Sequence, residues 1–301
     1  LFSIGVTTYN RPELLKQCLQ TILAQTCADF EVVVGNDYQA QPLTALQLGF
    51  DDPRIRVINY EQNLGELGNL NALLADARGE YFTWLADDDY YDPAFLADIR
   101  VALAGTEEVY AVFTDYVDVR FYDSKPRLLF RESKLAIPRS LTGRQFLTNY
   151  WRKEIKVMGL AGIYRTDYLR RLGGAGNLAN ARIAVLSESL ALIQSAMLDQ
   201  IIYLNRPLVY YRAHAGSWSS SNSDTESYEI AGINLLRHAL PIFQDARLSA
   251  DFGNNLTCLL KQMILLPIAK TRVRRKVGYS FLRVFGYLKV LNQECYGLIQ
   301  E

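Results

Sequence analysis

A short apolar run that ends in three consecutive carboxylates constrains this chain more than any other stretch. Tyr81–Leu85 has the length of a buried strand, and Asp87, Asp88 and Asp89 follow it almost at once. Three adjacent acids repel one another unless a positive charge lies among them. Oxygen ligands alone suit a hard cation such as Mg²⁺ or Mn²⁺. The pattern therefore predicts a cation site, and a solvated acidic turn is the alternative interpretation.

Strand and helix patterns alternate four times from Phe2 to about Leu103, which predicts an α/β fold with a doubly wound parallel sheet. Such sheets bind ligands beyond the carboxyl ends of their strands, where the acids lie. There is no Gly-x-Gly-x-x-Gly after the first strand and no Gly-Lys-Ser/Thr loop, which disfavours dinucleotide-binding and P-loop proteins. The expected strands are Phe2–Thr8, Phe30–Val34, Ile55–Ile58 and Tyr81–Leu85, with a short polar helix expected after Asp37.

Several motifs in this half resemble those of family-two inverting glycosyltransferases of the GT-A fold. The motifs stand in the family's order and at its spacing, strongly to about residue 103 and again over 159–217. They are Ile4–Pro12, Val32–Asp37, Asn63-Leu64-Gly65 with Asn71, Gly79–Asp89, Gly159–Arg165 and Arg212-Ala213-His214. The resemblance implies a GT-A mixed sheet flanked by helices. Residues 1–223 would form the catalytic domain, with a nucleotide-sugar half at about 1–103 and an acceptor half at about 104–223. Residues 224–301 would form a helical extension.

The resemblance also implies roles for single residues. Asp37 matches the acid that holds the nucleoside, and Asp88 matches the metal-binding member of the family's Asp-x-Asp motif. Asp89 and His214 are the further expected metal ligands, with Mn²⁺ or Mg²⁺ as the cofactor. Ala86 stands where the family often has Asp, so the supporting acid is Asp87 or Asp89. The remaining expected nucleotide-binding residues are Thr8, Tyr9, Asn10, Arg11, Asn63, Asn71, Asp87 and Arg212.

Glu188 is the expected catalytic base, because Ser187-Glu188-Ser189 lies where the family places its acid pair at the start of a helix. The role requires a carboxylate that can accept a hydroxyl proton during attack. A glutamate in a first helical turn is also favourable without any catalysis, which is the alternative interpretation. Asp115, at another expected strand end, is the competing base.

The rest of the chain carries weaker patterns. We expect a strand at Val109–Phe113, a hairpin over 116–130, and a helix over Arg139–Tyr150 capped by Ser140. Two further strands are expected at Ile201–Leu204 and Leu208–Tyr211. Small residues over 159–165 are expected to let a substrate approach the backbone. Three helices are expected at the end, over Tyr228–Phe243, Leu248–Ala269 and Arg272–Ile299.

Charge is unevenly distributed in a chain whose formal net charge is zero. From Lys261 onward there are eight Lys or Arg and two Asp or Glu, which leaves 24 basic and 30 acidic residues before it. The last helix pattern is amphipathic and basic, so we expect it to pack on the catalytic body or a second subunit, or to contact a membrane surface.

The four cysteines have no paired spacing, which indicates a reducing compartment. A cytoplasmic protein is therefore expected, with the inner membrane face as an alternative location.

The expected function is transfer of one sugar from a nucleotide-diphospho-sugar, with uridine diphosphate as the first choice, to a saccharide or lipid-linked acceptor. Surface polysaccharide or glycolipid synthesis would be its setting, and no nucleic-acid partner is expected. Two alternatives remain open. A sugar nucleotidyltransferase would need a glycine-rich loop after the first strand, and Tyr9–Pro12 lacks glycine. A non-catalytic sugar-binding protein on a degenerate fold is the other, since Ala86 and Ser187 depart from the family pattern.

Overall fold

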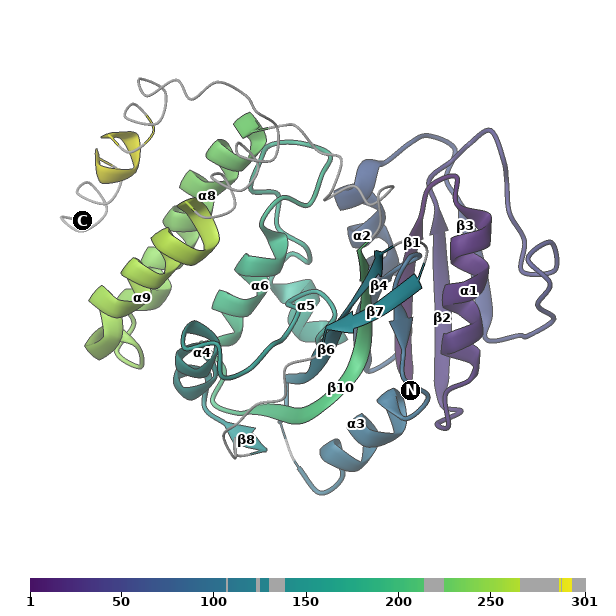
Figure 1. Cartoon of the computed structure of the whole chain (residues 1–301), viewed down its shortest axis with the longest axis horizontal. Helices are drawn as coiled ribbons and strands as arrows, with labels where there is room; N and C mark the ends of the chain where they lie inside the picture. The colour runs from purple at the N-terminus through teal and green to yellow at the C-terminus, as the bar shows by residue number, and fades with distance from the viewer. Residues whose placement is uncertain are drawn as a thin grey trace.

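A ten-stranded mixed sheet forms the centre of the chain in the computed structural model, which describes residues 1–106, 108–122, 125–129, 139–213, 225–265, 287 and 289–293 (Figure 1). The strands are β1 (Phe2–Thr8), β2 (Phe30–Asn36), β3 (Ile55–Asn59), β4 (Tyr81–Ala86), β5 (Tyr90–Tyr91), β6 (Ala111–Tyr122), β7 (Lys125–Leu129), β8 (Ser140–Leu141), β9 (Ile163–Arg165) and β10 (Ile201–Ala213). The helices are α1 (Pro12–Leu23), α2 (Gly65–Asp76), α3 (Phe95–Leu103), α4 (Gly143–Trp151), α5 (Thr166–Arg171), α6 (Ser187–Ser195), α8 (Thr225–Gln244) and α9 (Phe252–Cys258). A 3-10 turn precedes α9 at Ser249–Asp251, and a π-helical stretch follows it at Leu259–Leu265.

Strand direction brings the expected functional segments to one edge of the sheet. The order is β3-β2-β1-β4-β9-β6-β10-β5, and β3, β2, β1 and β4 pair in parallel. Strand β9 runs antiparallel to both β4 and β6, so β6 and its parallel partner β10 point the same way as β4. The carboxyl ends of β1, β2 and β4 therefore meet at one edge, as expected for ligand binding in such sheets.

The first half follows the sequence prediction closely, and the second half corrects it in several places. The polar helix expected after Asp37 is absent from the described residues, which form turns before β3. The segments expected as separate strands at 109–113 and 116–122 form one long strand, β6, and its hairpin partner β7 is confirmed. The strands expected at 201–204 and 208–211 are one strand, β10, with an irregularity between Leu204 and Val209.

The cap of α4 is also different from the one predicted. Ser140 pairs with β10 as part of β8, and Thr142 is the N-cap residue. The Thr142 hydroxyl accepts the Gln145 N–H while the Gln145 side chain accepts the Thr142 N–H, which is a complete capping box. Both Ser140 and Thr142 are good caps in principle. Strand pairing at Ser140 decides between them.

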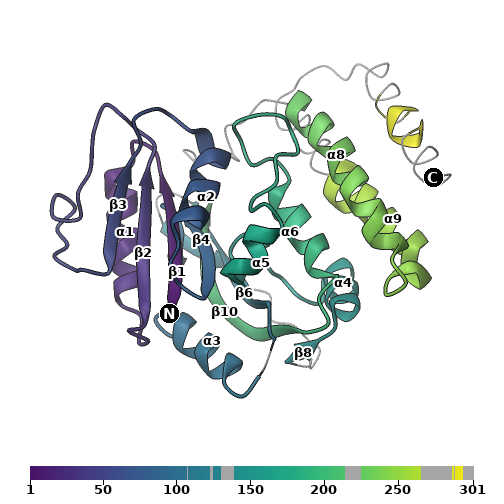
Figure 2. The same ribbon diagram turned by 180° about the vertical axis from the view of Figure 1, so that it is seen from behind.

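Two apolar clusters cover the two faces of the sheet. One lies under α1 and α3 and includes Leu15, Leu19, Leu96 and Ile99. The other is larger and lies under the helices α2, α4, α6 and α8. Figure 1 shows α1 over one face of the sheet, and Figure 2 shows α2, α5 and α6 over the other.

The helices after residue 225 extend the second cluster away from the strands β1 to β3. Helix α8 contributes fully buried side chains such as Leu235 and Phe243. Tyr287 and Leu291 are buried in the same cluster, whereas most of the predicted helix Arg272–Ile299 lies outside the described residues. Within the part of the chain that the structure describes, no helix has both the length and the apolar character needed to cross a bilayer.

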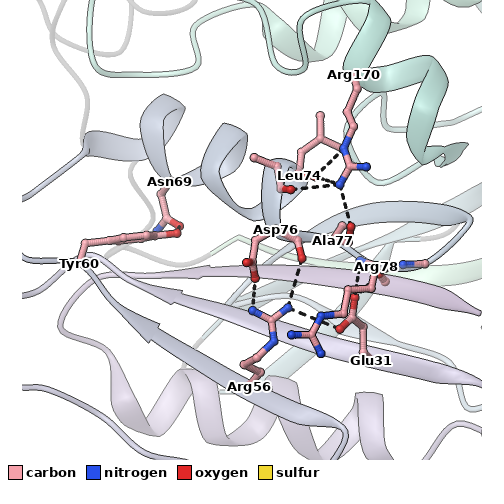
Figure 3. Close-up of polar contacts among 12 residues, drawn as sticks. Glu31, Arg56, Tyr60, Asn69, Leu74, Asp76, Ala77, Arg78 and Arg170 are labelled. Atoms are coloured by element: carbon pink, nitrogen blue, oxygen red, sulfur yellow. Dashed lines mark hydrogen bonds and ion pairs between the residues drawn. The ribbon is translucent and has the colours of Figure 1, made fainter.

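Two arginines, Arg170 and Arg56, bind the carboxyl end of α2 from different elements (Figure 3). Arg170 of α5 donates from Nη2 to the carbonyl oxygens of Leu74 at 3.0 Å, Ala75 at 3.1 Å and Ala77 at 2.7 Å. These are the carbonyls that a helix end leaves without internal partners, and the cation also complements the helix dipole. Arg56 of β3 pairs with Asp76 and, at 3.5 Å, with Glu31. One helix end is therefore tied to α5 on one side and to β2 and β3 on the other.

Replacing Arg170 tests this fastening. We expect Arg170→Ala to lower the free energy of unfolding by about 1–3 kcal/mol, because several α2 carbonyls lose a charged donor. Chemical denaturation followed by circular dichroism measures the loss. Arg171→Ala is the matched control, since Arg171 bonds only to Asp167 in the described contacts and is largely exposed. Equal effects for the two variants would contradict the proposed role of Arg170.

Candidate active site

The three acids after β4 surround a guanidinium group from the start of α1. Arg11 donates from Nη1 to Asp88 Oδ2 at 3.1 Å and from Nε to Asp87 Oδ2 at 3.3 Å, and Nη2 pairs with Asp87 Oδ1. The Thr8 hydroxyl donates to Asp87 Oδ2 at 2.6 Å. Burial raises the pKa of Asp87 to about 7, against the lowering effects of Arg11 and Thr8. Of the predicted nucleotide-binding residues, Thr8, Arg11 and Asp87 are thus brought together.

Asp89 and Arg212 join this acidic turn to β10. Asp89 Oδ1 accepts the backbone N–H of Arg212 at 2.8 Å, and Arg212 Nε donates to the Asp88 carbonyl at 2.6 Å. Arg212 Nη1 reaches Gln17 at 2.9 Å, and its guanidinium lies 4.4 Å from the Tyr90 ring centroid. Burial raises the pKa of Asp89, and the charge of Asp88 adds to this effect. These contacts give Asp89 and Arg212 a role in shaping the turn, and their predicted ligand contacts stay predictions.

The acidic turn offers oxygen donors that fit a hard divalent cation bound together with a phosphate ligand. Asp87 Oδ1 is a buried carboxylate oxygen without a hydrogen bond, although it is ion-paired with Arg11. Among the described residues, no three His, Cys, Asp or Glu side chains converge as a self-sufficient metal site. A cation such as Mg²⁺ commonly uses one or two carboxylates and takes its other ligands from substrate phosphates and water. Asp88 fits that role, and His214 lies outside the described residues.

Asp37 holds the turn that starts α2. Its Oδ1 accepts the Leu64 N–H at 2.6 Å and its Oδ2 accepts the Gly65 N–H at 2.8 Å. Asn63 Oδ1 also accepts the Gly65 N–H and bonds to Arg182 at 2.8 Å. Gly65 has φ of 75°, and a Cβ there would lie 2.7 Å from the Arg182 carbonyl oxygen. Asp37 is therefore fixed at the sheet edge beside Asn63, and its contact with a nucleoside stays a prediction.

Three other predicted nucleotide-binding residues differ in where they lie. Tyr9 is half exposed and meets the Tyr38 ring edge-on at 5.2 Å, next to Asp37. Asn10 has a left-handed backbone with φ of 53° between β1 and α1. Asn71 instead bonds the backbone of Ala175 in both directions, at 2.8 and 3.0 Å. Both functions of its amide are used there, so the geometry gives Asn71 a structural role between the two halves.

Glu188 lies at the same edge as the acids. Its Oε2 accepts the Leu160 N–H at 2.9 Å, and the Leu160 carbonyl accepts the Trp84 N–H of β4 at 3.4 Å. Leu160 therefore connects Glu188 to β4, the strand that ends just before Asp87. Gly159 makes this approach feasible, because a Cβ there would lie 2.2 Å from the Glu188 carbonyl oxygen. Gly159 belongs to the stretch predicted to let a substrate approach the backbone. In the structure it lets the backbone of helix α6 approach instead.

The environment of Glu188 suits a proton acceptor. Burial raises its pKa to about 7, partly offset by the N–H groups of Leu160 and Gly159, while the charge of Glu66 raises it further. A general base is most effective when its pKa lies near the working pH. Leu186, two residues before it, has φ of 60°, a strained conformation for a leucine that is found most often near functional sites.

Asp115, the competing base, is more deeply covered. It is 1% exposed, and its Oδ1 accepts the Tyr203 hydroxyl at 2.7 Å and the Lys156 N–H at 3.3 Å. Burial raises its pKa as well. These bonds fix β6 to the segment before Gly159. As a residue, Glu188 is only partly buried, although burial around its carboxylate is what raises its pKa.

Glu66 is a candidate site residue that the sequence pattern did not reveal. Its Oε2 accepts the Ala184 N–H at 3.0 Å, and the side chain is exposed. Surrounding protein raises its pKa, whereas the charge of Arg11 lowers it. Arg11 and Glu188 therefore both lie within electrostatic reach of Glu66. In sequence, Glu66 resembles any acid in a first helical turn. Only its position in the folded chain identifies it as a candidate site residue.

Comparison with known proteins gives a consistent result. The family model described as "Glycosyl transferase family 2" matches residues 3–171. The "Succinoglycan biosynthesis protein ExoO" of Rhizobium meliloti is 32% identical over 144 residues, which cover 47% of this chain and 40% of that protein. The "Putative colanic acid biosynthesis glycosyl transferase WcaA" of Escherichia coli is 29% identical over 164 residues, which cover 50% of this chain and 58% of that protein. The matches span about half the length of these curated relatives.

Solved structures share the fold of this chain. S. aureus TarS 1–349 in complex with UDP-GlcNAc aligns with a TM-score of 0.59 at 17% identity, over 90% of this chain and 83% of that one. The mannosyltransferase PcManGT from Pyrobaculum calidifontis, in complex with GDP-Man and Mn²⁺, aligns with a TM-score of 0.55 at 17% identity. That alignment covers 99% of this chain and 84% of that one. The central mixed sheet flanked by helices is thus the GT-A fold.

The ion pair inside the acidic turn can be tested through stability. We expect Arg11→Gln to lower the free energy of unfolding by roughly 2–4 kcal/mol, because a buried carboxylate loses its cation. The Arg11 side chain is 32% exposed and that of Asp87 is fully covered, so solvent screens the pair only in part. Denaturant melts at pH 8 measure the change. Arg144→Gln removes the exposed pair with Asp251 and should stay near wild type. A similar midpoint for both variants would show that Arg11 does not stabilise the turn.

Proposed function

Because the chain belongs to glycosyl transferase family 2, we propose that it transfers one sugar from a nucleotide-diphospho-sugar to an acceptor hydroxyl with inversion at the anomeric carbon. A single observation carries this proposal. A carboxylate with a pKa near 7, Glu188, and an acidic turn suited to a cation lie at one sheet edge and are joined through Leu160 and β4. That arrangement supplies a proton acceptor and an anchor for a diphosphate in one site.

The donor end of the proposed site lies at the ends of β1, β2 and β4. Asp37, Asn63 and Tyr9 would hold the nucleoside, and Asp88 would hold Mn²⁺ or Mg²⁺. When bound, the divalent ion supplies positive charge that stabilises the diphosphate as it leaves. Arg11 is positioned to add charge at the same place, since its guanidinium already contacts Asp88. Uridine diphosphate is the proposed nucleotide, supported by the UDP-GlcNAc complex of the structural relative TarS.

The acceptor end of the proposed site is organised by Glu188. Its carboxylate would accept the proton of the acceptor hydroxyl as that oxygen attacks the anomeric carbon from the face opposite the nucleotide. The Leu160 N–H orients the Glu188 carboxylate through a hydrogen bond. The relatives named for succinoglycan and colanic acid biosynthesis support a saccharide or lipid-linked acceptor and a setting in surface polysaccharide synthesis. A peripheral location at the inner membrane face is part of the same proposal.

Substituting Asp88 tests the cation anchor. We expect Asp88→Asn to remove the increase in melting temperature that UDP with MnCl₂ gives the wild type, because a ligand stabilises only through its affinity for the folded state. A panel of UDP and GDP, each with and without MnCl₂, also tests the choice of nucleotide. Asp51→Asn removes an exposed acid before β3 and should keep the full shift. Retention of the Mn²⁺-dependent shift in Asp88→Asn would refute the role of Asp88.

Substituting Glu188 tests the base. We expect Glu188→Gln to lower kcat at least about 100-fold, the range of general-base catalysis, while UDP binding is kept. In the wild type, the base works when deprotonated, so kcat/KM should rise with pH through about 7 and then level off. Steady-state kinetics from pH 5.5 to 9 measure the profile. Wild-type activity in Glu188→Gln would assign catalysis to another group.

A stability measurement checks the same pKa without turnover. The folded-state pKa of about 7 exceeds the ordinary value of 4.5, so the folded chain retains a proton that the unfolded chain releases between these values. The stability contributed by this group is full below pH 4.5 and is lost as the pH rises through 7. Relative to wild type, Glu188→Gln should therefore gain about 3 kcal/mol between pH 4.5 and 8. A difference that does not change with pH would show an ordinary pKa for Glu188.

A further inference from the structure

Three half-buried tyrosines lie near one another and near Glu188, and a lysine packs on one of them. They have no part in the proposed donor site. Tyr116 lies on β6, Tyr150 on α4 and Tyr211 on β10, so three separate elements bring them together. The Tyr116 and Tyr211 rings stand edge to face, with centroids 6.4 Å apart and planes at 81°. The Lys156 ammonium lies 4.1 Å from the centroid of the Tyr116 ring.

The backbone places this group close to Glu188. Lys156 is four residues before Leu160, whose N–H binds the Glu188 carboxylate. A four-residue step spans at most about 14 Å even when fully extended. The Lys156 N–H bonds to Asp115, which fixes the start of this segment against β6. Burial raises the pKa of Tyr150 to about 12 and the charge of Glu188 adds to it, which agrees with a short separation.

The polar groups beside the Tyr116 ring can take further hydrogen bonds. Lys156 Nζ lies 3.9 Å from Asp118 Oδ2, which is an ion pair but too long for a hydrogen bond. No hydrogen bond from Nζ occurs among the described residues, and 31% of the side chain is exposed. An ammonium donor and a carboxylate acceptor therefore stand next to each other above an aromatic ring.

A sugar is the kind of ligand that matches an aromatic ring with an ammonium and a carboxylate beside it. A pyranose ring has an apolar C–H face that can pack on an aromatic ring, and hydroxyl groups that need both donors and acceptors. The charges also discriminate between acceptors. Three carboxylates, those of Asp115, Asp118 and Glu188, face two cations, Lys156 and Arg120, and Arg120 pairs with Asp118 at 3.5 Å. When all five groups are ionised the local charge is negative, which disfavours an anionic sugar.

We propose that Tyr116, Tyr211 and Lys156 form the acceptor subsite of the transferase and that it takes the terminal ring of a neutral saccharide. The proposal rests on the proposed function, because it assigns the acceptor side of the site in which Glu188 is the base. Tyr150 of α4 lies within electrostatic reach of both Tyr116 and Glu188. A uronic acid or a phosphorylated sugar would place its own charge among the carboxylates and would bind more weakly.

The test measures acceptor binding separately from chemistry. Wild type is incubated with UDP and MnCl₂, and the methyl glycosides of glucose, galactose and mannose are offered with methyl glucuronide as the charged probe. Saturation-transfer NMR titrations report binding. We expect at least one neutral glycoside to bind at least tenfold more tightly than methyl glucuronide. Failure of every neutral glycoside to bind, or preference for the glucuronide, would overturn the proposal.

Variants assign that binding to residues. Tyr116→Ala and Lys156→Met should each weaken binding of the neutral glycoside at least tenfold. Tyr210→Ala is the matched control, because successive strand residues point to opposite faces, and it should bind like wild type. Melting temperatures of the variants show whether each is folded, and Lys156→Met keeps the proposal testable if Tyr116→Ala is unstable. Unchanged binding in a folded Tyr116→Ala or Lys156→Met variant would overturn the assignment.

Hydrolysis of UDP-glucose in the same samples separates this proposal from the proposed function. Slow release of UDP to water needs the donor site and Glu188 but no acceptor subsite. We expect the control Tyr210→Ala to retain it within twofold. If hydrolysis and UDP binding are absent from wild type while the neutral glycoside binds, the proposed function fails and the saccharide subsite stands. If hydrolysis occurs and no glycoside binds, the subsite fails alone.

Discussion

The site depends on how three neighbouring carboxylates are held at the end of one buried strand. Asp87 is completely covered, and such a group would normally take up a proton or disrupt the turn. Arg11 resolves the conflict by pairing with both Asp87 and Asp88, and the Arg212 backbone binds Asp89. Asp87 and Asp88 therefore share one cation, and a backbone N–H binds Asp89. Asp88 is the proposed cation ligand because it matches the metal-binding member of the family's Asp-x-Asp motif.

Helix α2 is where the first part of the chain meets the segment around residues 170–184. At its start, Glu66 accepts the Ala184 N–H, and further along Asn71 bonds to Ala175. At its end, Arg170 binds the last carbonyls (Figure 3). Polar contacts with good geometry fix orientation more strictly than apolar packing does, because they are directional. The segment around residues 170–184 is therefore held at a defined position relative to α2 and to Asp37, which binds the start of that helix.

Sequence motifs and structural roles agree for some residues and diverge for others. Thr8, Arg11 and Asp87 lie together as the motifs predict. Asn71 belongs to the same set of motifs, yet its amide is used entirely by a backbone 104 positions away. Glu66 and Lys156 have no motif and lie next to the candidate base or its supporting segment. A motif records which residues occur together in sequence, whereas the partner of a side chain depends on long-range packing.

Local sequence patterns were enough to predict the alternation of strands and helices in the first half, the buried strand β4 and the acids that follow it. Local periodicity and turn residues are sufficient for those features, because each depends on neighbours within a few positions. Long-range pairing, in contrast, made 111–122 one strand and made Thr142 the cap of α4. It also brought Glu188, through Leu160, to the edge where Asp87 lies. These outcomes depend on pairing between segments far apart in the chain. No pattern of neighbouring residues predicts which distant segments will pair, because strand preference depends on the packing around it.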